Sequence, residues 1–144
     1  MKYTVQPYTF YSHKEYLSLL RILKEKTAYI SIVPIEYEGS TNEIISLANK
    51  YMSCIRQKKV NRWPGTVRKG PGAKQYEFAA NKRFFEELER YESFFINETN
   101  EYGWEEVRTT DFGLDDIAFL DSQNELLFFT TTHEGYAFIR EDLL

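Results

Sequence analysis

Two histidines, His13 and His133, are the only side chains of this sequence that ordinarily carry out acid–base chemistry near neutral pH. His133 follows three threonines and precedes Glu134, a composition that could form a hydrolytic site or half of a metal site. Neighbours on a strand point to opposite faces, however, so His133 and Glu134 would not converge. Zinc needs three or four ligands, and neither an HExxH motif nor a Cys/His spacing is present. The sequence therefore favours a turn position for His133, with no metal.

Four aspartates, Asp111, Asp115, Asp116 and Asp121, suggest a second chemistry, because paired carboxylates can hold the magnesium of a nuclease. Such a site would also need a nearby lysine or histidine, and no lysine follows Lys82. The glycine-rich loop after residue 69 lacks the spacing of a phosphate-binding Walker motif. These residues predict no cofactor and favour a protein that is not an enzyme, with acids that are solvated or face a basic partner.

A basic stretch with one tryptophan offers a third chemistry, the binding of nucleic acid. Clustered cations contact phosphates, and an indole can stack on a base. The stretch comprises Arg56, Lys58, Lys59, Arg62, Trp63, Arg68, Lys69 and Lys74. A net charge of −4 and a pI near 5.3 argue against this function. Cations at a helix C-terminus followed by a loop would explain the stretch equally well, so nucleic-acid binding stays an alternative.

The elements that would position these residues begin with two helices and a strand. A Ser-x-x-Glu capping box begins at Ser12, and the helical spacing of apolar residues after it predicts a helix over 13–26. β-branched residues predict a strand over 28–37. Pro34 within it cannot donate to a ladder, which predicts an edge strand or a bulge. A second capping signature and apolar stripe predict a helix over 42–58.

The remainder is predicted to be mainly strands. Glycine and proline concentrate in 61–74, which predicts a loop, and a short strand over 75–79 leads to a helix over 82–96 capped by Asn81. Four further strands are predicted over 104–109, 116–120, 126–132 and 136–140. Their short connections predict an antiparallel meander, in which the apolar 126–129 is the central strand. We therefore expect an α+β fold, with three helices packed on a mostly antiparallel sheet and a C-terminal β-meander.

Length and composition set the wider expectations. The 144 residues predict one domain, 1–144, and an aromatic content of 17% excludes a disordered chain. The single cysteine cannot close an internal disulfide, and neither a secretory signal nor an apolar run long enough to span a bilayer is present, so a cytoplasmic protein is expected. Residues 1–72 carry 12 basic and 5 acidic side chains, whereas 73–144 carry 6 and 17. The folded surface is either polarised or, if the halves interleave, mixed.

The C-terminal half resembles a known class of bacterial proteins. The segments 113–121, 126–129 and 132–136, with 63–66 and the aromatic helix after Asn81, resemble small Gram-positive proteins encoded beside polymorphic, contact-delivered toxins. The resemblance rests on a hydrophobic pattern and a Thr-His-Glu-Gly-Tyr turn, without a catalytic signature. It implies a cytosolic immunity protein that binds a cognate protein toxin and blocks it. Contact residues do not transfer, because the partner-facing surface of such proteins diverges.

The charge distribution is consistent with this role. Many such toxins are nucleases with basic clefts, and an acidic inhibitor would approach such a cleft with complementary potential. Aromatic side chains within a charged rim are typical of binding hot spots, and the region 98–125 has that composition. The predicted partner-binding residues are Glu101, Tyr102, Trp104, Asp111, Asp115, Asp116 and Asp121.

Overall fold

The computed structural model of the chain describes residues 3–5, 12–35, 43–108 and 115–143. In chain order the elements are β1 (Tyr3–Val5), α1 (His13–Lys26), β2 (Tyr29–Val33), α2 (Glu43–Tyr51), β3 (Cys54–Val60), β4 (Arg62–Trp63), β5 (Thr66–Val67), β6 (Ala73–Ala79), α3 (Lys82–Leu88), β7 (Ile96–Thr99), β8 (Glu105–Arg108), β9 (Asp116–Leu120), β10 (Leu126–Thr131), the 3-10 turn η1 (Thr132–Glu134), β11 (Tyr136–Arg140) and the 3-10 turn η2 (Glu141–Leu143).

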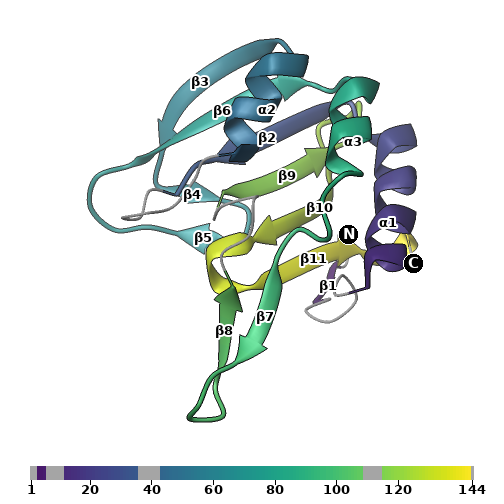
Figure 1. Cartoon of the computed structure of the whole chain (residues 1–144). Helices are drawn as coiled ribbons and strands as arrows, with labels where there is room; N and C mark the ends of the chain where they lie inside the picture. Colours follow the sequence, from purple (N-terminus) through teal and green to yellow (C-terminus); the bar gives the residue numbers. More distant parts are fainter. Residues whose placement is uncertain (1–2, 6–11, 36–42, 109–114, 144) are drawn as a thin grey trace.

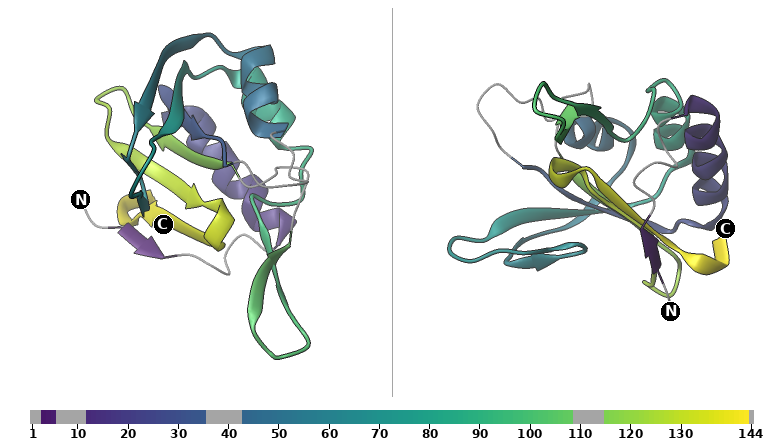
Figure 2. Two further views of the ribbon diagram at one scale, coloured as in Figure 1. Left: turned by 90° about the vertical axis from the view of Figure 1, so that its left-hand side faces the viewer. Right: turned by 90° about the horizontal axis from the view of Figure 1, so that it is seen from below.

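Seven strands form one sheet in the order β1-β11-β10-β9-β2-β6-β3, and every neighbouring pair is antiparallel. The three helices cover one face of this sheet (Figure 1), which the view from below shows as a second layer (Figure 2, right). β9, β10 and β11 follow one another as a meander. The predicted α+β class, with helices on an antiparallel sheet and a C-terminal meander, is confirmed.

α1 forms where the sequence predicts it, for the predicted reason. The Ser12 hydroxyl accepts a hydrogen bond from the backbone N–H of Glu15 at 3.3 Å, which satisfies one of the donors left free at a helix N-terminus. The apolar stripe of Tyr16, Leu19, Leu20 and Leu23 is buried. At the other end the Thr27 N–H bonds to the Leu23 carbonyl, so the helix is closed at both ends.

The core between helices and sheet is rich in aromatic rings. Phe94 and Phe128 approach to 5.1 Å between ring centroids, and Phe94 meets Tyr16 edge-on at 5.0 Å. The ring centroid of Phe119 on β9 lies 5.8 Å from that of Phe85 and 6.0 Å from that of Phe128. Rings in such arrangements contribute roughly 0.5–1.5 kcal/mol per pair beyond their burial. This layer explains the high aromatic content and holds the sheet rigidly under the helices.

A smaller apolar cluster lies on the opposite face of the sheet. Strand alternation turns Ile32 toward the helices and Val33 away from them. Val33 packs there with Trp63 and Ala73, so the short β4–β5 hairpin closes over this part of the sheet. Trp63 is only 6% exposed.

The β7–β8 hairpin forms a separate two-stranded sheet that projects away from the body of the molecule (Figure 1; Figure 2, left). Its tip lies at the far end from the helices in both views. The predicted strand over 104–109 corresponds to β8, whereas its partner β7 was not predicted.

Several element predictions are wrong. The helix predicted over 42–58 ends at Tyr51, because the following residues form the edge strand β3 against β6. The helix predicted over 82–96 ends at Leu88, and the loop predicted over 61–74 contains β4 and β5. β2 is an interior strand rather than an edge strand, because it ends at Val33, before Pro34. β1 was missed as well.

Candidate functional site

Two of the seven predicted partner-binding residues are buried. Asp115 is 0% exposed and Asp116 is 3% exposed, so the expectation that both lie on an acidic surface is wrong. Their burial follows from position, since Asp115 directly precedes β9 and Asp116 is its first residue, where backbone and side-chain donors surround them. Asp111 lies outside the described residues.

Asp115 receives backbone hydrogen bonds at the start of α2. The N–H of Ile45 donates to Asp115 Oδ2 at 3.4 Å, and Ile35 supplies a second backbone hydrogen bond. The other oxygen, Oδ1, has no hydrogen-bond partner within the described ranges. Burial raises the pKa of Asp115 to about 7; the two backbone hydrogen bonds oppose this, and the charge of Asp116 adds to it. The carboxyl is therefore partly protonated near neutral pH.

Asp116 joins three segments that are far apart in the sequence. Its Oδ2 accepts a hydrogen bond from Trp63 Nε1–H at 2.9 Å, and its Oδ1 accepts one from the backbone N–H of Thr132 at 2.8 Å. His133 Nδ1 lies 3.0 Å from the same Oδ1. This buried carboxylate therefore holds the β4–β5 hairpin and η1 against the start of β9.

The contact with Asp116 also changes the protonation of His133. Burial alone lowers the pKa of His133, but the hydrogen bond and charge of Asp116, assisted by Glu134, outweigh burial and raise that pKa above its usual value. The second ring nitrogen, Nε2, lies 3.7 Å from Glu134 Oε1. The predicted turn position of His133 is confirmed, since it lies in the 3-10 turn η1, but the expectation that His133 and Glu134 would not converge is wrong. The described parts of the chain contain no group of three potential metal ligands.

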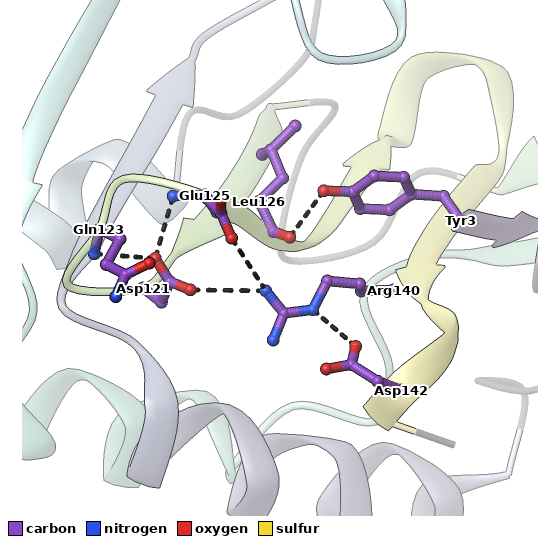
Figure 3. Close-up of polar contacts among 7 residues, drawn as sticks. All are labelled: Tyr3, Asp121, Gln123, Glu125, Leu126, Arg140 and Asp142. Carbon is purple, nitrogen blue, oxygen red and sulfur yellow. Dashed lines mark hydrogen bonds and ion pairs between the residues drawn. The ribbon is translucent and has the colours of Figure 1, made fainter. Parts of the chain in front are cut away.

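Asp121 belongs to a structural network at the β9–β10 turn (Figure 3). Its Oδ1 accepts the backbone N–H groups of Gln123 and Glu125 at 2.9 and 3.0 Å, and its Oδ2 lies 3.4 Å from Arg140 Nη1. Arg140 also donates to Asp142 at 2.6 Å. These contacts, led by the hydrogen bond from Glu125, lower the pKa of Asp121. The β9–β10 turn lies apart from the β7–β8 hairpin in Figures 1 and 2, so Asp121 does not share a surface with the residues of that hairpin.

The remaining predicted partner-binding residues lie together at the tip of the β7–β8 hairpin. Glu101 is exposed, Tyr102 is 75% exposed and Trp104 is 72% exposed, and the two rings lie 6.4 Å apart between centroids. The Asn100 side chain accepts the backbone N–H groups of Tyr102 and Trp104 at 2.9 and 3.0 Å. Gly103 has a φ of +82°, which a glycine adopts without strain. The tip therefore presents two aromatic side chains on a hydrogen-bonded turn.

The alternative nucleic-acid set is only partly suited to its predicted role. Trp63 is buried and hydrogen-bonded to Asp116, so its predicted stacking on a base is wrong. The cations of the set are exposed: Arg56, Lys58, Lys59, Arg62, Arg68, Lys69 and Lys74. They come from β3, β4, β6 and the chain between β5 and β6, and not from a helix C-terminus.

Residues that the sequence did not single out complete the surroundings of this basic region. Tyr76 on β6 and Ile35 after β2 line a pocket together with Lys59 and Lys74. Their involvement depends on the pairing of β3 with β6, which the sequence did not predict. Within the sequence, only the alternation of residues over 73–79 could have indicated which side chains of β6 share a face.

No protein-family model, curated protein or solved structure matches this chain. None of the described helices combines the length and apolar character needed to cross a bilayer.

Proposed function

We propose that this protein binds and blocks a partner protein, as an immunity protein blocks its cognate toxin, and that the tip of the β7–β8 hairpin is the part that enters the partner. One observation carries the proposal: Tyr102 and Trp104 are largely exposed side by side on a projecting hairpin. Such side chains dominate binding hot spots, where each can contribute about 2 kcal/mol or more.

The turn that carries these rings supports the same function. Three hydrogen bonds to Asn100 fix the backbone of the tip: two reach its side chain, and the Gly103 N–H donates to its carbonyl at 3.0 Å. A binding loop that is ordered before it meets its partner loses less conformational entropy on association. Glu101 adds a negative charge beside the rings, which favours a partner with a basic cleft.

The resemblance to immunity proteins suggests where to find the partner. The protein encoded by the neighbouring gene is the natural probe, and its binding to the purified chain can be measured by calorimetry. We expect the double variant Tyr102→Ser/Trp104→Ser to weaken binding by at least about 30-fold, which corresponds to about 2 kcal/mol. Tyr136→Ser is the matched control, because Tyr136 is an exposed tyrosine on the body of the sheet.

A growth assay tests the inhibitory part of the proposal. Co-production of the chain should relieve growth arrest caused by the neighbouring protein, and the double hairpin variant should lose this protection while the Tyr136→Ser variant retains it. Protection and binding that are unaffected by the hairpin substitutions would refute the assignment to the tip. Absence of binding to the neighbouring protein would refute the immunity function.

A further inference from the structure

A pocket of about 650 Å³ is lined by residues from β3, β4, β5, β6 and η1. Figure 1 shows how these elements are arranged. Pockets of roughly 300–1,000 Å³ are typical for small-molecule ligands. Six of its lining residues carry the argument: Lys59, Trp63, Arg68, Lys74, Tyr76 and His133. The pocket is separate from the aromatic tip of the β7–β8 hairpin.

Two lysines lie side by side on neighbouring strands in one wall of this pocket. Lys59 on β3 is paired in register with Lys74 on β6, so both side chains leave the same face of the sheet. Arg68 also lines the pocket, and its backbone N–H donates to the Asn61 carbonyl at 2.7 Å. Like charges directly opposite each other destabilise a sheet. Among the residues that the structure describes, none of the three cations has an ion-pair partner.

The other face of the same two strands shows the contrasting arrangement. Glu77 forms ion pairs with both Arg56 and Lys58, with N–O distances of 3.5 and 3.4 Å. Strand alternation places Lys58 and Lys59 on opposite faces. The cations on one face therefore have an acidic neighbour within the protein, whereas those at the pocket have no acidic partner among the residues that the structure describes.

The rest of the pocket wall suits an organic molecule. Pro34, Ile35 and Tyr76 provide apolar and aromatic surface beside the cations. His133 reaches the pocket in an orientation that its Nδ1 contact with Asp116 fixes. A pocket with both kinds of surface can hold the charged part and the organic part of one ligand.

From this arrangement we infer that the pocket binds a small organic phosphate of nucleotide size, with the phosphoryl group between Lys59, Arg68 and Lys74 and the organic part against Tyr76 and Ile35. A phosphate is favoured over a carboxylate because three cations line this one pocket, which suits a dianion. A nucleic-acid strand is less well matched, because the buried indole of Trp63 offers no ring face for stacking.

Tryptophan fluorescence offers a direct test in a Trp104→Phe background. The chain has two tryptophans, so this substitution leaves Trp63 as the only one, and Trp63 lines the pocket. The probes are adenosine 5′-monophosphate, inorganic phosphate, adenosine and a single-stranded oligonucleotide. We expect the monophosphate to change the emission saturably in about the micromolar to millimolar range. Adenosine should not do so, and inorganic phosphate should compete with the monophosphate.

Charge removal on the two faces of the β3–β6 pair provides the matched comparison. Lys59→Gln/Lys74→Gln should weaken binding of the monophosphate at least about tenfold, whereas Lys58→Gln should leave it within about twofold. Unfolding midpoints of the variants establish that each is folded.

The proposal is overturned if the monophosphate gives no saturable change, if adenosine binds equally well, or if inorganic phosphate fails to compete. Equal losses on the two faces would also overturn it. An oligonucleotide that binds more tightly than the monophosphate, with dependence on Arg56 and Lys58, would instead identify a nucleic-acid surface. None of these results depends on partner binding by the β7–β8 hairpin, so they test the pocket independently of the proposed inhibitory function.

Discussion

Replacing Asp115 with asparagine should make the stability of the protein less sensitive to pH. The folded chain raises the pKa of this carboxyl from 3.8 to about 7, chiefly because it is buried with one oxygen unpartnered among the described residues. A group with a raised folded pKa contributes stability that is fully present below the unfolded value. That contribution is lost as the pH rises through the folded value. The wild type should therefore lose stability between about pH 4 and pH 7 on account of this group.

The magnitude follows from the two pKa values. Their difference corresponds to about 4 kcal/mol over the whole range, and to about 3 kcal/mol between pH 5 and pH 8.5. A domain of this size is stable by about 5–15 kcal/mol in total, so the change is readily measured. Asparagine keeps the side-chain size and an oxygen that can accept the Ile45 N–H, but it has no proton to release.

Urea denaturation of Asp115→Asn and wild type at pH 5 and pH 8.5 measures the effect as a difference of differences. Any pH-independent change in stability caused by burying the amide cancels when the two pH values are subtracted. The contributions of other titrating groups such as His133 cancel between the two proteins, since both proteins share them. Relative to the variant, the wild type should lose about 3 kcal/mol between the two pH values. Asp121→Asn is the control that should show no such change between these two pH values, because the folded chain lowers the pKa of Asp121, so this group is ionised in both the folded and the unfolded state from pH 5 upward. A difference between wild type and Asp115→Asn that does not change with pH would refute the reasoning.

Three further predictions test other parts of the structure by denaturant unfolding. Asp116→Ala should destabilise the fold by about 2–4 kcal/mol, because it leaves buried donors without an acceptor, and a loss below about 1 kcal/mol would contradict its role as a junction. Gly65→Ala should destabilise the fold more than Gly70→Ala. Both glycines have a positive φ, which costs an alanine about 1–2 kcal/mol, but only at Gly65 would the new methyl group also clash with Thr131 Oγ1, at 2.2 Å. Equal losses would contradict that contact. Lys74→Gln should stabilise the unliganded protein by about 0.2–1 kcal/mol at low salt, and a destabilisation would contradict like-charge repulsion at this position.

Much of the fold was predictable, because its strongest local signals agree with the tertiary structure. The capping serine and apolar period of α1, and the apolar runs of β9 and β11, gave the observed bounds of those elements. β3 was not predictable in this way. Ile55 continues the helical spacing of the preceding apolar residues, but it lies 55% exposed on an edge strand whose formation depends on pairing with β6.

The candidate sites were predictable only in part. Exposure of Tyr102 and Trp104 follows from their place in a polar turn, where they have no apolar neighbours to pack against. Burial of Asp115 and Asp116 ran against the usual behaviour of aspartate, and it depends on donors from residues as remote as Trp63. The convergence of Lys59 and Lys74 required the register of two strands, which no local pattern in the sequence contains.

The pairing of β1 with β11 has a consequence for how the protein is made. Tyr3 is opposite Arg140, and the Tyr3 hydroxyl donates to the Leu126 carbonyl at 2.8 Å, so β1 cannot dock until β11, more than 100 residues later in the chain, has been synthesised. Contacts between such distant segments form late and slow the search for the native state. Until β1 docks, β11 is an unpaired edge strand with which another nascent chain can pair and aggregate. Accumulation of this protein at high expression should therefore depend on the three residues of β1.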